Sequence, residues 1–267
     1  MNLRRNLLMY QLPHISFSSY KLRGEQMWDR AIGLAFPVYR PVLVALVTLD
    51  TFLCAIAAIL YTYFDSQNRG HSVARFWSRL NLALSGVSAS MSGEDRIDQN
   101  QPYIVMANHQ SHYDVFALMG LLPLQLRWVI KMELRKIPIF GIACEKVGYI
   151  FIDRGDHEKA QKSLEAAGEK IRAGSSVIFF PEGTRSADGK LQPFKKGGFV
   201  IALEAKVPIL PVTVVGGKEV LPKGSLHILP GNMKVIIHEP IYVDGYTYET
   251  KERLMERVKT AIEKDLE

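Results

Sequence analysis

Short apolar runs alternate with helical segments from residue 103 onward, and this alternation restricts the fold more than any other feature of the chain. The runs of strand length lie at residues 103–107, 126–130, 149–152, 176–180, 207–215 and 233–238. Segments with helical spacing lie at residues 113–121, 139–147, 157–173, 197–205 and 250–266. Strands that are apolar throughout need cover on both sides, and helical connections favour parallel pairing. The sequence therefore predicts an α/β fold, with a mixed, largely parallel sheet covered by helices on both faces.

A longer apolar run at residues 42–63 has about the length of a helix that crosses a bilayer. Asp50 lies near its middle, where a charge is costly in hydrocarbon. Basic residues flank both ends of the run, so the positive-inside rule assigns no orientation. These features favour an interfacial or re-entrant hairpin with a second, amphipathic helix at residues 72–84, and a single anchor helix is the alternative. In either case we expect an N-terminal membrane-binding helical element.

Polar stretches at residues 65–70 and 92–101 separate this N-terminal part from the rest of the chain. We therefore expect an N-terminal extension at residues 1–41 and a membrane-associated helical segment at residues 42–85. The domain that contains the predicted sheet follows at residues 86–267. The extension shows no clear periodicity before Met27, which is an alternative start of the chain.

Charge and cysteine content narrow the class of partner and the compartment. The formal net charge is +6, which suits phosphate-bearing partners such as anionic lipid surfaces, phosphorylated metabolites or nucleic acid. No Lys/Arg-rich run with interleaved aromatic residues is present, so nucleic acid is the least favoured of the three. Cys54 and Cys144 both lie among apolar residues, which indicates buried thiols in a reducing compartment rather than a disulfide framework.

An imidazole and a carboxylate stand five residues apart in the run NHQSHYD at residues 108–114. A carboxylate behind an imidazole fixes its tautomer and offsets its charge, which is the minimal device for removing a proton from a hydroxyl. Five residues correspond to about 140° around a helix, so His109 and Asp114 meet only if His109 precedes the helix. Ser111 is a suitable N-cap for that arrangement. A hydrogen-bonded core histidine is the ordinary alternative.

The same run also has the composition of a metal site. His109, His112 and Asp114 are all of metal-ligating types. However, residues three apart face each other only on a helix, and His109 is expected before the helix begins. No other cluster of Cys, His or Asp completes a set of ligands. We therefore predict no metal, and a metal-dependent phosphohydrolase is an alternative function.

A second candidate site follows the apolar run at residues 176–180, in the sequence FPEGTRS at residues 180–186. Gly183 permits close backbone approach, and the planar guanidinium of Arg185 matches phosphate oxygens. The loops after strands are where α/β sheets usually bind ligands. A solvated surface turn is the alternative. Further cations after predicted strands or before a predicted helix suggest one positively charged cleft: Lys131, Arg154, Lys195 and Lys196.

Four sequence blocks, in this order, resemble the glycerolipid acyltransferase family and specifically the 1-acylglycerol-3-phosphate acyltransferases. The blocks are NHQSHYD at residues 108–114, GYIFIDR at 148–154, FPEGTRS at 180–186 and VPILPV at 207–212. The resemblance covers residues 77–238 and includes KMEL at residues 131–134. Four ordered matches make a chance similarity a poor explanation.

The resemblance implies acyl transfer from a thioester, either acyl-CoA or acyl carrier protein, to the free 2-hydroxyl of lysophosphatidic acid. The product is phosphatidic acid. It implies that His109 is the general base and that Asp114 holds it. It also implies that substrate is bound by Lys131, Arg154, Glu182, Gly183, Thr184 and Arg185.

The family likeness further implies that residues 86–267 form an acyltransferase catalytic domain attached to a membrane lipid surface by two N-terminal helices. We expect this membrane to be the bacterial inner membrane, with the catalytic domain at its cytoplasmic face. No metal or redox cofactor is expected, and the absence of a GxSxG sequence gives an acyl-serine route no support. Another acceptor, such as a lysophospholipid or glycerol-3-phosphate, is an alternative, as is a non-catalytic lipid-binding membrane protein.

Overall fold

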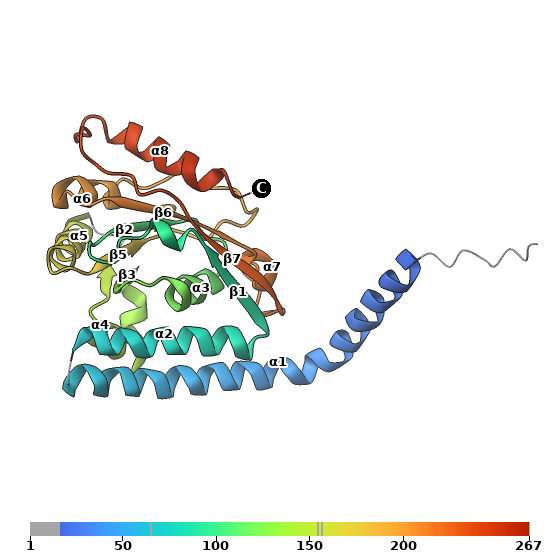
Figure 1. Cartoon of the computed structure of the whole chain (residues 1–267). Coiled ribbons are helices and arrows are strands. Elements are labelled where there is room, and N and C mark those ends of the chain that lie inside the picture. The colour runs from blue at the N-terminus through green and yellow to red at the C-terminus, as the bar shows by residue number, and fades with distance from the viewer. Residues whose placement is uncertain (1–16, 65, 154, 156, 267) are drawn as a thin grey trace, which may run out of the picture. The chain divides into compact units, whose positions relative to one another are not determined.

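The computed structural model describes residues 17–64, 66–153, 155 and 157–266, and within them seven strands form one sheet (Figure 1). The strand order is β1-β7-β6-β2-β5-β3-β4. The strands are β1 (Val87–Ser92), β2 (Ile104–Ala107), β3 (Leu126–Lys131), β4 (Ile150–Ile152), β5 (Ser176–Phe179), β6 (Ile209–Val215) and β7 (Gly231–Ile237). Every neighbouring pair is parallel except β6 and β7. The predicted mixed, largely parallel sheet is therefore confirmed.

Alternation along the central strands divides the apolar side chains between two cores. In β2, Val105 belongs to one buried cluster and Ile104 to the other, as the two-residue period of a strand requires. The first cluster lies under α2 (Gln67–Leu84) and α3 (Tyr113–Leu121). The second cluster lies under α5 (His157–Arg172), α6 (Gly197–Ala205) and α8 (Lys251–Glu263). Helices cover both faces of the sheet, as predicted (Figure 1).

Five strands point their carboxyl ends toward the same edge of the sheet. Strand β2 pairs in parallel with β5 and β6, β5 with β3, and β3 with β4. The segments that follow β2, β3, β5 and β6 therefore begin at a common edge. This topology brings together parts of the chain that lie more than 100 residues apart, as the register of Ala107 with Val212 shows.

Helix α1 (Phe17–Phe64) precedes α2, and contact density divides the chain into the units Met1–Val42 and Leu43–Glu267. Within the second unit, α1 and α2 are joined by polar side chains. Asn81 Nδ2 donates to Asp50 Oδ2 at 2.8 Å, and Trp77 Nε1 donates to Thr51 Oγ1 at 3.0 Å. The carboxylate at residue 50 thus faces its partner helix. The structure contains the two-helix arrangement expected here, and its insertion into a lipid surface stays a prediction.

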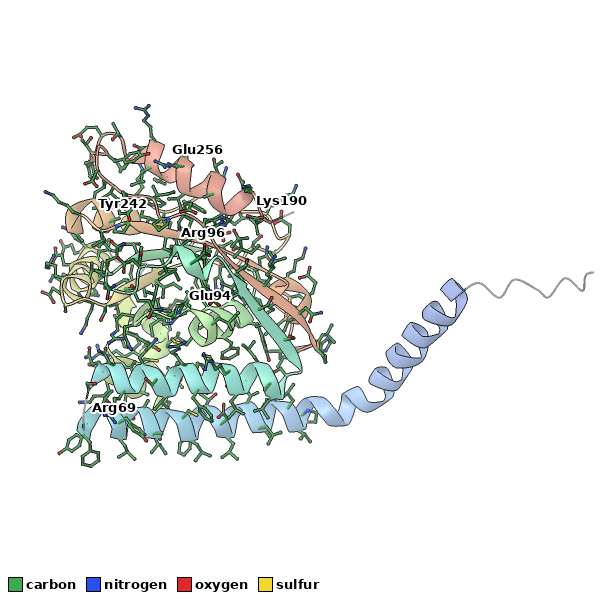
Figure 2. All side chains as sticks on the ribbon, in the orientation of Figure 1. Arg69, Glu94, Arg96, Lys190, Tyr242 and Glu256 are labelled. Atoms are coloured by element: carbon green, nitrogen blue, oxygen red, sulfur yellow. The ribbon has the colours of Figure 1, made fainter. Side chains whose placement is uncertain are left out.

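One helical span among the described residues, Pro41–Phe64, is long and apolar enough to cross a membrane, judged by length and composition alone. Only three residues of this span, Leu43, Ala55 and Ala58, are buried. Figure 2 shows side chains along this part of α1 that project away from the sheet. The large exposed apolar side chains include Val44, Leu46, Leu49, Phe52, Leu53 and Leu60. This surface is consistent with membrane association.

Several elements were not predicted. In strand β1 the apolar residues Val87, Ala89 and Met91 alternate with serines and pack inward, so the strand lacks a continuous apolar run. Helix α1 begins at Phe17, where the sequence shows no periodicity. The 3₁₀ turns η1 (Glu94–Arg96) and η2 (Met132–Lys136) and the helix α7 (Gly217–Val220) are too short for periodicity to reveal. Helix α4 (Phe140–Val147), by contrast, matches the predicted segment at residues 139–147.

Candidate active site

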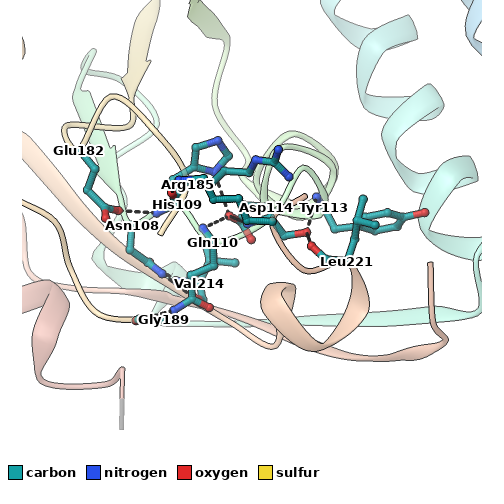
Figure 3. Close-up of polar contacts among 12 residues, drawn as sticks. Asn108, His109, Gln110, Tyr113, Asp114, Glu182, Arg185, Gly189, Val214 and Leu221 are labelled. Carbon is teal, nitrogen blue, oxygen red and sulfur yellow. Dashed lines mark hydrogen bonds and ion pairs between the residues drawn. The ribbon is translucent and has the colours of Figure 1, made fainter. Parts of the chain in front are cut away.

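The histidine and the aspartate of the first block meet at the carboxyl end of β2 (Figure 3). Because β2 ends at Ala107 and α3 begins at Tyr113, His109 lies in the connecting turn and Asp114 in the first helical turn. The distance between His109 Nδ1 and Asp114 Oδ2 is 3.0 Å. Asp114 is fully buried. The geometry predicted for this pair is therefore confirmed, and its catalytic role stays a prediction.

Backbone amides hold the aspartate in place. The Gln110 and Ser111 N–H groups donate to Asp114 Oδ2 at 2.7 and 2.8 Å. Since Asp114 Oδ2 already accepts two hydrogen bonds, we assign the proton between the pair to His109 Nδ1. That tautomer leaves Nε2 as an acceptor. The prediction that Ser111 is the N-cap is wrong by one residue, because His112 occupies that position and forms no side-chain cap.

Asn108 fixes the start of the turn that contains His109. Its Nδ2 donates to the Val214 carbonyl oxygen at 2.8 Å, and its Oδ1 accepts from the Val214 N–H at 2.7 Å. These two bonds extend the pairing of β2 with β6 beyond the last backbone partners, Ala107 and Val212. Asn108 is 1% exposed. Both polar atoms of the Asn108 side chain are used by Val214, so this amide positions the turn that contains His109.

Glu182 supports His109 from the side opposite Asp114, as Figure 3 shows. Its Oε1 accepts from the backbone N–H of His109 at 2.7 Å, and its Oε2 accepts from that of Gln192 at 2.9 Å. The side chain is buried. Burial raises the pKa of Glu182 to about 7, and the two amide hydrogen bonds together only partly oppose this effect. The carboxylate thus joins the loop after β5 to the turn that contains His109.

The imidazole is also held by its ring face. His109 stacks on Phe180 with ring centroids 3.8 Å apart and planes within 8°. Phe180 in turn packs against Trp128 of β3, with centroids 5.6 Å apart. The side chain of His109 remains 14% exposed. The ring is therefore fixed by the carboxylate and the stacked phenyl group while part of it stays accessible.

Replacement of Glu182 by glutamine should reduce both stability and turnover, because an amide cannot accept hydrogen bonds through both of its polar atoms. The loss of stability should depend on pH. The raised pKa of Glu182 means that the folded wild type binds a proton more tightly than the unfolded chain. This contribution is complete below the unfolded value of 4.5 and is lost as pH rises through about 7.

Urea denaturation of wild type and E182Q at pH 5 and pH 8 checks this expectation. The difference in free energy of unfolding should be larger at pH 5. An equal difference in free energy of unfolding at pH 5 and pH 8 would contradict the raised pKa assigned to Glu182. The exposed Glu256 of α8 offers a matched control, because E256Q also exchanges a carboxylate for an amide but at the protein surface.

A pocket of about 380 Å³ adjoins His109. Its polar lining contains His109, His112, Lys131, Thr184, Arg185 and Lys223. Apolar and small side chains from five other segments complete it, among them Ala55 and Ala58 of α1, Trp77 of α2, Met119 of α3, Ile130 of β3 and Ala143 of α4. A base, several cations and a long apolar wall thus share one cavity, an arrangement suited to an amphiphile with an anionic group.

The structure brings most of the predicted site residues to this pocket. Lys131, Gly183, Thr184 and Arg185 line it together with His109. Glu182 does not line it, since both of its oxygens bind backbone amides. Arg154 lies outside the described residues. These contacts test only where the side chains lie, and their roles toward substrate stay predictions.

The predicted basic cleft contains fewer cations than expected. The side chain of Lys195 lies beside Gly183 but does not line the pocket. Lys196 forms an ion pair with Glu252 of α8 at 3.1 Å. Lys223, by contrast, was not anticipated, because it follows β6 outside the four blocks.

His112 lies in a cationic environment. Burial lowers the pKa of His112, and the nearby Arg185 lowers it further. Among the residues that the structure describes, no group of three or more His, Cys, Asp or Glu side chains is arranged to hold a metal ion. Neither observation favours the metal site considered for His109, His112 and Asp114.

Comparison with known proteins places these features in a family. Residues 88–215 match the model of the Acyltransferase family. A 1-acyl-sn-glycerol-3-phosphate acyltransferase of Saccharomyces cerevisiae is 31% identical over 233 residues, which are 85% of this chain and 77% of that protein. The chain belongs to this acyltransferase family. The likeness stated from the four sequence blocks is thereby confirmed.

Other members of the acyltransferase family show how far the similarity extends. The chloroplastic 1-acyl-sn-glycerol-3-phosphate acyltransferase BAT2 of Brassica napus is 36% identical over 67% of this chain and 53% of that protein. The chain spans 53–62% of the length of the first curated relatives that it matches. The crystal structure of the 1-acyl-sn-glycerophosphate (LPA) acyltransferase PlsC from Thermotoga maritima shares the fold, with a TM-score of 0.67 and 29% identity. That match covers 84% of this chain and 97% of the Thermotoga protein.

Proposed function

We propose that this acyltransferase moves a fatty acyl group from a thioester to the 2-hydroxyl of lysophosphatidic acid, giving phosphatidic acid. The names of its relatives support this acceptor. The observation that carries the proposal is the 3.0 Å contact of His109 Nδ1 with Asp114, in a pocket that also contains Arg185 and an apolar wall. The contact leaves His109 Nε2 to receive a proton from the acceptor.

The reaction needs only one proton carrier. The acceptor oxygen attacks the thioester carbonyl carbon while its proton passes to His109 Nε2. Asp114 stabilises the resulting imidazolium through the hydrogen bond to Nδ1. Collapse of the tetrahedral intermediate breaks the carbon–sulfur bond, and the thiolate takes the proton from the imidazolium. Atoms and charges balance without a metal, a redox cofactor or a covalent acyl-enzyme.

Cations and small residues after β3 and β5 supply the acceptor site in this proposal. Arg185 presents a planar, permanently charged group that matches phosphate oxygens, and Lys131 adds a second charge. Gly183 and Thr184 line the same pocket and, as small residues, leave room for the glycerol backbone. Arg154 is assigned to this site on family likeness alone.

The apolar wall of the pocket suits an acyl chain, and it includes residues of α1 and α2. The outer side of α1 carries exposed apolar side chains, such as Leu49 and Phe52. We infer that α1 and α2 rest in a membrane lipid surface, from which an amphiphilic acceptor enters the pocket. In a bacterium this surface is the cytoplasmic face of the inner membrane, where the thioester donors acyl-CoA and acyl carrier protein are available.

Replacement of Arg185 by alanine should act mainly on binding of the acceptor, because a guanidinium has no proton to give or take. We expect KM for lysophosphatidic acid to rise about tenfold or more, which corresponds to the loss of one charge-assisted hydrogen bond. Initial rates at varied acceptor and saturating donor measure both constants. An unchanged KM with a lower kcat would contradict this role.

A thiol-release assay tests the proposed function directly. Purified protein in lipid vesicles receives palmitoyl-CoA or palmitoyl acyl carrier protein together with one acceptor from a panel. The panel contains lysophosphatidic acid, lysophosphatidylcholine and glycerol-3-phosphate. We expect free thiol and phosphatidic acid in equal amounts with the first acceptor. Absence of thiol release with every pair would refute the proposal, and preference for another acceptor would replace lysophosphatidic acid within it.

A further inference from the structure

Lys223 lies at the pocket beside Arg185, although it belongs to none of the four sequence blocks. Its Nζ donates a hydrogen bond to the backbone carbonyl oxygen of Arg185 at 2.7 Å. Both residues line the pocket that contains His109. Lys223 reaches this place from the segment that follows β6 and α7. The carboxyl end of β6 thus contributes a cation to the pocket, as those of β3 and β5 do.

A turn fixes the backbone at Lys223. The Ser225 N–H donates to the Pro222 carbonyl oxygen at 3.1 Å, which closes a four-residue turn around Lys223 and Gly224. Gly224 has a φ of +82°, a conformation that glycine adopts without strain. The side chain of Lys223 is exposed, yet hydrogen bonds hold both its backbone turn and its ammonium group. The position of this lysine is therefore more restricted than that of an ordinary surface lysine.

The contact with Arg185 leaves much of the charge of Lys223 available. An ammonium group has three donors, and the Arg185 carbonyl oxygen takes one. In the part of the chain that the structure describes, neither Lys223, Arg185 nor Lys131 forms an ion pair with a carboxylate. Three cations without an internal counterion therefore line one pocket. A phosphomonoester, with a charge of about −1.5 to −2 at neutral pH, is the anion that such a group fits.

Hydrogen bonds place the cations Arg185 and Lys223 close to His109. The Ser186 N–H donates to the His109 carbonyl oxygen at 2.7 Å, so the residue after Arg185 is bonded to the turn that contains His109. Lysophosphatidic acid carries its phosphate one carbon and one oxygen away from the carbon that bears the reacting hydroxyl. A hydroxyl at His109 therefore brings the phosphate near Arg185. The phosphomonoester of acyl-CoA, by contrast, is separated from the thioester by the whole pantetheine arm.

We propose that Lys223 binds the phosphate of the acceptor together with Arg185, an inference that rests on the acyl transfer proposed above. Replacement by methionine keeps the length of the side chain and removes its charge. The K223M protein should show a KM for lysophosphatidic acid raised about tenfold, with kcat and the KM for acyl-CoA nearly unchanged. K223R should retain most of the affinity.

Lys218 offers a matched control. Its Nζ also donates to a backbone carbonyl oxygen, that of Asp188 at 2.9 Å, but Lys218 does not line the pocket. K218M should behave as wild type with both substrates. An equal rise of KM in K218M and K223M would show a general charge effect and overturn the specific role of Lys223.

A neutral acceptor separates binding from a structural role. With 1-monoacylglycerol, which lacks the phosphate, K223M should match wild type. Equal losses with both acceptors would mean that Lys223 only holds the loop of Arg185, and a raised KM for acyl-CoA alone would mean that it binds the donor; either result overturns the proposal. Wild-type turnover with an unaffected K223M contradicts only this inference, whereas a wild type that releases no thiol contradicts the proposed function as well.

Discussion

Replacement of His109 by alanine should lower the turnover of thiol release by roughly 10²- to 10⁴-fold, the usual contribution of a general base. Among the described residues that line the pocket, His109 is the one whose imidazole contacts a buried carboxylate, Asp114, through Nδ1, which leaves Nε2 to accept a proton in the proposed reaction. The fold should persist, because Asp114 keeps its hydrogen bonds from the Gln110 and Ser111 amides. Single-turnover rates with saturating acceptor and donor measure the loss.

Two further variants make this result specific. Asp114→Asn should also lower turnover, since an amide cannot stabilise an imidazolium as a carboxylate does. His227 is an exposed histidine that does not line the pocket, and H227A should keep wild-type turnover. Near-normal turnover in a folded H109A protein would end the assignment of His109 as the base.

Replacement of Gly217 by alanine should lower kcat by about 10²-fold, although this glycine lies outside every sequence block. Gly217 begins α7, and a Cβ atom there would collide with Asp114 Oδ1. Within the described part of the chain, that oxygen is buried without a hydrogen-bond partner, so no hydrogen bond to it resists displacement. A shift of about 1 Å in a catalytic group can cost about 10²-fold in rate. Substrate KM should change little, because Gly217 does not line the pocket.

Gly231, at the start of β7, provides the matched control. An added Cβ at Gly231 meets a methyl group of Val220 at 3.3 Å, which is the far end of a side chain rather than a catalytic group. G231A should retain its turnover. In an Asp114→Asn background, G217A should cost little more, because both changes disturb the same carboxylate. Additive losses, or wild-type kcat in folded G217A, would show that Gly217 does not act through Asp114.

The sequence predicted the central strands and the histidine–aspartate geometry for identifiable physical reasons. Strands β2 and β5 are buried on both faces, so β2 appears as an unbroken apolar run and β5 as one after its first residue, Ser176. The spacing of His109 and Asp114 permits contact only in a turn followed by a helix, and that is the structure found. Helices α3 and α6 match their predicted bounds, because both are apolar segments between clear loops.

The supporting groups of the site could not be predicted, because they depend on which strands are neighbours. Asn108 binds Val214 only because β2 lies next to β6, and nothing in either segment specifies that pairing. Glu182 follows β5 and resembles a substrate ligand in sequence, yet its contacts are the amides of His109 and Gln192. Lys223 likewise reaches the pocket from beyond β6. The sequence signal for Lys223 was modest, because it consisted only of a pair of glycines and a lysine after a buried strand.

The wall that α1 contributes to the pocket has a practical consequence for handling this protein. Thr51, Cys54, Ala55 and Ala58 line the same cavity as His109, so this part of α1 forms a wall of the pocket. A protein truncated before α2 would lose this wall, which the proposed function assigns to the acyl chain. Studies in detergent therefore need the helix retained, and we expect an inhibitor that occupies the apolar wall to compete with the acyl chain.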